Sequence, residues 1–277
     1  MYLKPKSLSD AVAVLASSRA QILAGGTDFF PALGERLPQG DVLDITGVPE
    51  IRGVTLENEH IRIGGLTTWT EIIQTPLPRC FEALKAAARE IGSLQIQNRA
   101  TVAGNLCNAS PAADGVPPLL ALDSEIELTS QSGMRRLPLS QFITGNRRTE
   151  RRSDEILAAV LVPRRFENAA SVFLKLGARK YLVISISMVA VVLATDAGRI
   201  TEARITVGSC SAVARRLSGL EAELAGQPAD RELTALVRPD HLTPLSPIDD
   251  IRATAEYRRD ASLILVRRAL QACVGSA

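Results

Sequence analysis

Apolar residues recur every three to four positions in several segments, which is the spacing that places them on one face of an α-helix. In the last of these segments Tyr257, Ala261, Ile264, Leu265 and Leu270 would share one face. Several of the segments begin at a capping residue or end at a glycine. The pattern predicts helices over residues 7–18, 27–37, 78–92, 215–226 and 254–273.

Shorter apolar runs, several of them ended by glycine or proline, predict β-strands. The segment 117–128 predicts a short helix followed by a strand. Further strands are expected at 21–26, 41–45, 155–163, 172–176, 183–194 and 203–208, and as a pair within 51–69. Because the composition changes at 164–171, we expect a first domain over 1–168, with subdomains of about 1–50 and 51–168, and a second domain over 169–277.

The composition fits two folded domains, since 46% of the 277 residues are hydrophobic and 22% are charged. A net charge of +2 argues against a nucleic-acid-binding protein, which needs a clear basic excess. The four cysteines are far apart and there are two histidines, so no metal site is expected and a reducing compartment is indicated. The apolar run 181–195 is too short to span a membrane, and we expect a cytoplasmic chain.

The stretch LAGGTD, residues 23–28, is the first candidate site. A strand that enters a Gly–Gly turn and leaves through a helix directs several backbone N–H groups to one point, where an anion binds well. The glycines would let an oxygen atom approach the backbone. An ordinary tight turn before a helix has the same composition, so this stretch alone does not decide between the two.

The stretch TVAGNLCNASPAAD, residues 101–114, is the second candidate. Thr101, Gly104, Asn105 and Asn108 would form a second loop of small residues with hydroxyl and amide donors, and Asp114 suits a ribose hydroxyl. The alternative is a structural loop packed on the preceding helix. Two such loops could hold a diphosphate from both sides. Neither contains a GxGxxG or GxxxxGK[ST] pattern, so a Rossmann or P-loop site is not supported.

Two basic features leave alternatives open. Lys175, in a strand-like run, is either buried near a ligand or solvated at a sheet edge. The arginine-rich segment 147–155 alternates in sign, which is typical of a solvated loop; a docking surface for an acidic partner is the less favoured interpretation.

Five stretches in register, ILAGGTD, NRATVAGNLCNASPAAD, PPLLALDSEIEL, DEILAAVLVP and the C-terminal IDDIRATAEYRRDASLILVRRAL, resemble the FAD-binding subunit of molybdenum hydroxylases. That family includes the medium subunit of carbon monoxide dehydrogenase and the FAD-binding subunit of xanthine dehydrogenase. The resemblance covers nearly the whole chain. It implies an α+β protein: a two-subdomain FAD-binding fold of the vanillyl-alcohol-oxidase type, followed by a C-terminal α/β domain.

By position, the resemblance also implies which residues hold FAD. The first diphosphate loop would consist of Leu23, Ala24, Gly25, Gly26, Thr27 and Asp28. The second would consist of Thr101, Gly104, Asn105 and Asn108. Asp114 would hold the adenosine end, Ile156 and Leu157 would pack near the flavin ring, and Lys175 would lie close to the isoalloxazine and tune it. No catalytic residue is assigned.

The resemblance implies an oxidoreductase subunit that passes electrons through FAD. A molybdenum-cofactor large subunit and an iron–sulfur small subunit would be its partners, in an assembly expected to be doubled, and NAD⁺, oxygen, a quinone or another carrier would accept the electrons. This chain lacks the four-cysteine insertion of one branch of the family. A stand-alone flavin oxidase or dehydrogenase of the same superfold is the alternative, and an assembly subunit that has lost FAD is the third interpretation.

Overall fold

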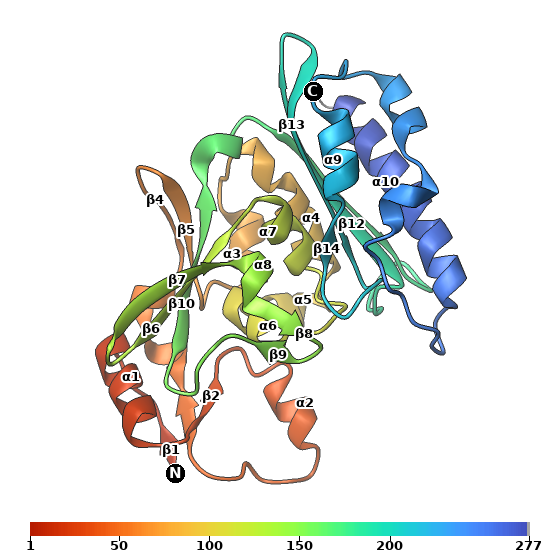
Figure 1. The fold of residues 1–277 in the computed structure, drawn as a ribbon. Coiled ribbons are helices and arrows are strands. Elements are labelled where there is room, and N and C mark those ends of the chain that lie inside the picture. The colour runs from red at the N-terminus through yellow and green to blue at the C-terminus, as the bar shows by residue number, and fades with distance from the viewer. Residues whose placement is uncertain (276–277) are drawn as a thin grey trace.

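The computed structural model describes residues 1–275, and its first 50 residues form a small unit around a parallel sheet of order β1–β3–β2 (Figure 1). Ser7 caps the first helix, because its Oγ accepts a hydrogen bond from the Asp10 amide at 3.1 Å. The elements of this unit are β1 (Tyr2–Leu3), α1 (Leu8–Ser17), β2 (Gln21–Leu23), α2 (Phe29–Leu33) and β3 (Val42–Asp44).

The middle of the molecule is an antiparallel sheet of order β4–β5–β10–β6–β7. Its strands are β4 (Val54–Leu56), β5 (His60–Gly64), β6 (Glu125–Ser130), β7 (Gly133–Pro138) and β10 (Ile156–Pro163). Between β5 and β6 the chain forms α3 (Trp69–Gln74), α4 (Glu82–Glu90), α5 (Leu94–Gln97), α6 (Val102–Asn108) and α7 (Val116–Ala121). Between β7 and β10 it forms α8 (Leu139–Phe142), β8 (Ile143–Gly145) and β9 (Arg148–Thr149).

Strand β10 is apolar at almost every position because both of its faces are buried. Ile156 and Ala158 pack in the core of the first unit, together with residues of α1 and β3. Leu157, Val160 and Val162 belong instead to the large core of the middle sheet. The start of β10 therefore lies where the first two units meet.

The C-terminal region is a four-stranded antiparallel sheet with two helices. Its elements are β11 (Ala170–Leu176), β12 (Ser187–Asp196), β13 (Arg199–Gly208), β14 (Arg215–Arg216), α9 (Ser218–Leu224) and α10 (Ala255–Gly275). Along β12, Met188 and Ala190 join the large core, whereas Val189 and Val191 join the core that α9 and α10 share with this sheet. The long apolar run in this part of the sequence thus buries both faces of one strand.

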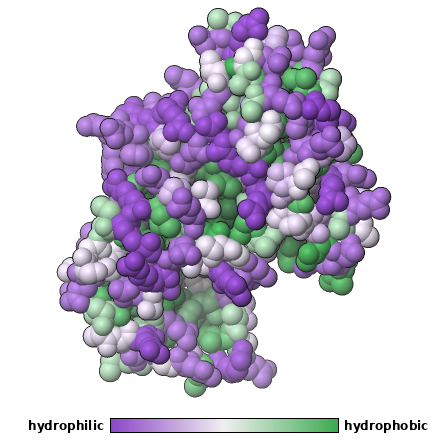
Figure 2. Space-filling view, in the orientation of Figure 1, coloured by the Kyte–Doolittle hydropathy of each residue, from purple (hydrophilic) through white to green (hydrophobic). Residues whose placement is uncertain are grey.

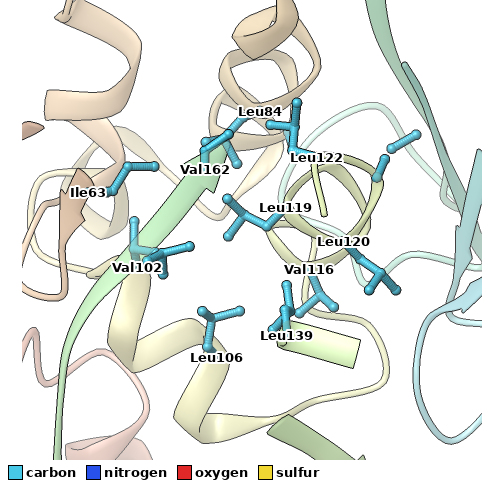
Figure 3. Packing of buried hydrophobic residues seen from close by; sticks show 14 of the residues in the cluster. Ile63, Leu84, Val102, Leu106, Val116, Leu119, Leu120, Leu122, Leu139 and Val162 are labelled. Carbon is cyan, nitrogen blue, oxygen red and sulfur yellow. The ribbon is translucent and has the colours of Figure 1, made fainter. Parts of the chain in front are cut away.

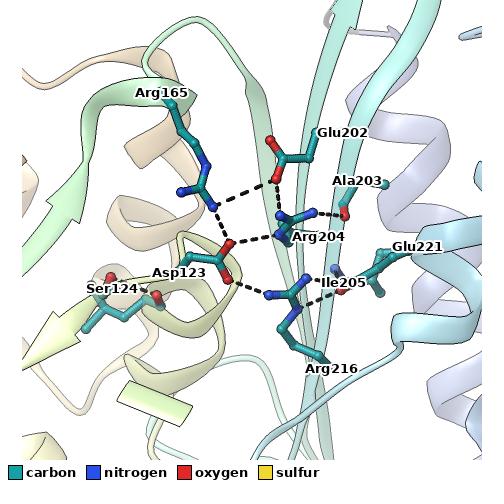
Figure 4. A network of polar contacts seen from close by, with 10 residues as sticks. Asp123, Ser124, Arg165, Glu202, Ala203, Arg204, Ile205, Arg216 and Glu221 are labelled. Atoms are coloured by element: carbon teal, nitrogen blue, oxygen red, sulfur yellow. Dashed lines mark hydrogen bonds and ion pairs between the residues drawn. The ribbon is translucent and has the colours of Figure 1, made fainter. Parts of the chain in front are cut away.

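Ion pairs also link the middle unit to the C-terminal sheet (Figure 4). Asp123, which follows α7, accepts hydrogen bonds from Arg165 at 2.5 Å, from Arg204 at 3.0 Å and from Arg216. Arg216 also pairs with Glu221 of α9, the Nε–Oε1 distance being 2.9 Å. Three guanidinium groups therefore converge on one carboxylate at this junction.

One expectation about the second candidate stretch is wrong, because residues 102–108 form helix α6 rather than a loop. Thr101 caps this helix, and Val102 and Leu106 give it a buried face. Figure 3 shows both side chains pointing into the same core as Leu119. A capping threonine followed by apolar residues four apart was the signal for a helix in this stretch.

Two further expectations need correction. In α10, Tyr257 and Ile264 are 51% and 47% exposed, and the buried face runs instead through Ala261, Leu265 and Ala269. The helix expected over 27–37 is the short α2, which is closed by Gly34 in the left-handed region. Within the described residues, no helix is long and apolar enough to cross a membrane.

Candidate functional site

A cavity of about 470 Å³ lies where the loop after β2, helix α6 and the start of β10 meet. Apolar side chains form much of its wall, among them Ile22, Ile45, Trp69, Ile91 and Ile96. Figure 2 shows a hollow with a largely apolar floor between the lower lobe and the middle of the molecule. An aromatic ring system could be buried against such a wall, while polar groups at one side fix its orientation.

The loop after β2 offers backbone donors to this cavity. The amides of Gly25, Gly26, Thr27 and Asp28 donate no hydrogen bond to any acceptor within residues 1–275, and all four residues line the cavity. Gly26 has a φ of 79°, which a residue with a Cβ rarely adopts. Successive unpaired amides at one turn bind an anionic oxygen well, because they need an acceptor and their dipoles favour negative charge.

Gly25 also sets how closely the two candidate stretches approach each other. A Cβ at this position would lie 2.0 Å from the carbonyl oxygen of Arg99 and 3.0 Å from the Cα of Ala100. The first loop therefore packs directly on the backbone that leads into α6. Glycine is required here by the contact between two backbones, independently of any ligand.

Helix α6 meets the cavity in a different way, because its first amides already have partners. Val102 donates to the Thr67 carbonyl at 3.0 Å, and Gly104 donates to Thr101 Oγ1 at 3.0 Å. Ala103 donates to the Gly65 carbonyl at 2.9 Å. The second stretch therefore contributes side chains and space to the cavity, and it is not the loop of hydroxyl and amide donors that was expected from the sequence.

The space arises at Gly104, where a Cβ would meet Thr101 Oγ1 at 3.0 Å and no other atom within 4 Å outside the neighbouring helix backbone. Two buried polar atoms of the wall, Asn105 Oδ1 and Trp69 Nε1, have no hydrogen-bond partner among the described residues. Buried polar atoms normally have partners, but both atoms are enclosed by protein even with the cavity empty, so they give no evidence for a ligand. The unpaired amides, the open glycine and the apolar wall together fit the diphosphate and rings of FAD.

Asp114 and Lys175 pair with each other rather than facing this cavity. Lys175 Nζ lies 2.8 Å from Asp114 Oδ2, and Ser185 Oγ donates to Asp114 Oδ1 at 2.6 Å. Burial raises the pKa of the Asp114 carboxyl, although Lys175 opposes that shift. Lys175 also donates to the carbonyl of Glu90, whose neighbour Ile91 lines the cavity. The assigned roles of Asp114 and Lys175 toward FAD stay predictions.

The cavity brings together most of the residues assigned from the sequence. On its wall lie Ala24, Gly25, Gly26, Thr27, Asp28, Thr101, Gly104, Asn105, Asn108, Ile156 and Leu157. Leu23, Asp114 and Lys175 are not on the wall. Leu23 is buried at the end of β2, between the wall residues Ile22 and Ala24.

The sequence interpretation missed ten wall residues: Ile22, Phe29, Ile45, Trp69, Ile91, Ile96, Ala100, Ala103, Cys107 and Arg151. Arg151 belongs to the segment that was expected to be a solvated loop. Nothing in the alternating charges of that segment shows that its fifth residue turns toward the first loop and α6. Trp69, the single tryptophan, is the first residue of α3 and lies between Thr68 and Glu71, which form a capping box. Such a box predicts a helix start but no role in a cavity.

A cavity between two subdomains, lined by unpaired amides and followed by a separate sheet-and-helix domain, fits the FAD-binding fold of the vanillyl-alcohol-oxidase type that the resemblance implies. Family models give the particular group: the FAD binding domain in molybdopterin dehydrogenase matches residues 1–165, and the CO dehydrogenase flavoprotein C-terminal domain matches residues 173–273. The chain belongs to the family of FAD-binding subunits of molybdenum hydroxylases. The resemblance seen in the sequence is confirmed.

Individual relatives agree over nearly their full length. The xanthine dehydrogenase FAD-binding subunit of Escherichia coli O157:H7 is 31% identical over 281 residues, covering 100% of this chain and 96% of that protein. The nicotinate dehydrogenase FAD-subunit of Eubacterium barkeri is 35% identical over 240 residues, with 83% and 81% covered. The structure of carbon monoxide dehydrogenase from Hydrogenophaga pseudoflava matches with a TM-score of 0.89 at 28% identity, covering 99% of this chain and 96% of that one. The chain is therefore an FAD-binding subunit of an oxidoreductase.

Proposed function

We propose that this subunit carries electrons from iron–sulfur clusters on a partner subunit, through FAD, to an external acceptor. The observation that carries the proposal is the row of four unpaired amides in a cavity between two subdomains. Relatives named as FAD subunits or medium chains of larger enzymes support it. A molybdenum-cofactor large subunit and an iron–sulfur small subunit would complete the enzyme.

FAD, when bound, supplies the ability to accept electrons singly and release them in pairs. The protein's own residues bind and orient it. The amides of Gly25–Asp28 would hold the diphosphate, Gly104 would leave room for it, and Ile156 and Leu157 would exclude water from one side of the cavity.

The character of the wall favours electron transfer over substrate oxidation on this chain alone. Stand-alone flavin oxidases of this superfold usually place a catalytic Tyr, His, Arg or Ser over the ring. Within the described residues, the cavity wall contains no histidine, tyrosine or serine. Of these four residue types, the described part of the wall contains only arginine, at Arg151. The surroundings of Arg151 indicate a role in binding.

Anaerobic mixing tests the proposal. The FAD-loaded chain is combined with its co-purifying partner subunits and their substrate, and the flavin absorbance is followed. We expect bleaching only when both partners are present. Bleaching by substrate with this chain alone would establish the stand-alone oxidase instead. Reoxidising the reduced protein with NAD⁺, oxygen or a quinone then identifies the acceptor.

A further inference from the structure

Arg151 is the one cationic side chain on the cavity wall within the described residues. It lies in the segment between β9 and β10, five residues before Ile156. The one anionic side chain on the same wall, again among the described residues, is Asp28 of the first loop. These two side chains therefore cancel in charge before any ligand is considered.

The guanidinium of Arg151 is held at one nitrogen and open at the other two. Nη1 donates to the carbonyl of Glu155 at 2.8 Å and to that of Arg152 at 3.0 Å. The Glu155 side chain is fixed in turn by Arg135, with an Nε–Oε1 distance of 2.6 Å. Nε and Nη2 of Arg151 donate to no acceptor within residues 1–275. Those two nitrogens form the edge of the guanidinium that binds a phosphate with two parallel hydrogen bonds.

The negative charge expected in the loaded cavity favours a cation such as the Arg151 guanidinium. A dinucleotide diphosphate brings about two negative charges, and Asp28 adds one more. The first amides of α6 are already paired inside the protein and give little help. Cys107, beside Arg151, does not compete for it, because burial raises the pKa of its thiol to about 11 and keeps it neutral.

We infer that Arg151 binds the phosphate charge of FAD, a role that the small-residue stretches alone do not reveal. The inference rests on FAD binding by this chain. Arg151 then complements the first loop: the loop amides contact the diphosphate from the backbone, and the guanidinium neutralises part of its charge from the opposite segment.

Titration of apoprotein tests the inference with Arg151→Gln and the matched control Arg148→Gln, which changes an exposed arginine of the same segment that is not on the wall. FAD and ADP binding are measured directly, and adenosine serves as the uncharged probe. We expect Arg151→Gln to weaken FAD and ADP binding roughly tenfold or more, with a smaller salt dependence, and to leave adenosine binding unchanged. Arg148→Gln should bind all three like the wild type.

Several outcomes would overturn the inference. Equal FAD and ADP affinity in Arg151→Gln and wild type excludes phosphate recognition, and an equal loss for adenosine shows that charge is not the cause. Arg151→Lys keeps the positive charge but loses the two parallel N–H donors of the guanidinium. It should therefore recover part of the ADP affinity that Arg151→Gln loses. No recovery in a folded Lys variant also contradicts the inference. If the wild-type chain itself bound no FAD, the proposed function would fail rather than the role of Arg151.

Discussion

The two stretches that meet at the cavity are similar in composition and opposite in the use of their polar groups. In the loop after β2, the amides of Gly25–Asp28 have no acceptor in the described chain. In residues 101–114, the first amides of α6 bind carbonyls and the Thr101 hydroxyl, and Asp114 binds Lys175. The first stretch thus leaves its backbone donors unpaired at the cavity, whereas the second uses its polar groups mainly within the protein.

The largest expected effect concerns the buried ion pair of the second stretch. Lys175→Met leaves Asp114 without its cation, and breaking a buried pair costs about 3–5 kcal/mol of stability. Burial already raises the pKa of Asp114, and loss of Lys175 raises it further. Because the folded variant holds this proton to higher pH than the unfolded chain, where the pKa is about 3.9, its stability should fall as pH rises through the folded pKa.

Urea unfolding of Lys175→Met across a range of pH measures this loss of stability and its pH dependence. The double variant Asp114→Asn/Lys175→Met is the control and should lose the added pH dependence. A Lys175→Met protein that is as stable as the wild type at every pH would show that the pair contributes nothing. The same variant also tests the assigned flavin-tuning role: it should retain FAD with a lower reduction potential.

Gly25→Val should damage the first loop nearly as much. Its Cβ would lie 2.0 Å from the Arg99 carbonyl oxygen, so the loop and the segment before α6 must separate. We expect a loss of about 3 kcal/mol in stability together with loss of bound FAD. Thermal unfolding of the apoprotein and the flavin content after purification measure the two effects. A fully yellow variant of normal stability would contradict this packing.

Gly104→Leu tests the second stretch, where the glycine leaves space in the cavity. At Gly25, by contrast, the glycine allows two backbones to make contact. A Cβ at Gly104 meets one side-chain oxygen, so we expect the fold to be retained while FAD affinity falls roughly 100-fold. Leucine also has a higher helix propensity than glycine. Fluorescence titration of FAD, with a thermal melt of the apoprotein as control, separates the two quantities. A drop in melting temperature as large as that of Gly25→Val would show that Gly104 is needed for packing instead.

The sequence predicted which two stretches meet at the cavity, because glycines, small residues and flanking elements are local signals. It could not predict how the amides of α6 are used, since Val102 binds Thr67, a partner supplied by tertiary structure. The Asp114–Lys175 pair joins residues 61 positions apart, and the orientation of Arg151 depends on the carbonyl of Glu155. Local patterns therefore located the cavity, whereas the pairing of its polar groups required the fold.

Thr101→Ala is expected to have the smallest effect and distinguishes most directly between the two uses of small polar residues. If the Thr101 hydroxyl mainly caps α6 by accepting the Gly104 amide, its loss should cost about 1 kcal/mol of stability and change FAD affinity less than tenfold. Thr101→Ser keeps the hydroxyl and should behave like the wild type. Urea unfolding and FAD titration give both numbers. Unchanged stability with a large loss of FAD affinity would assign this hydroxyl to the cofactor, and the two stretches would then be alike in function as well as in composition.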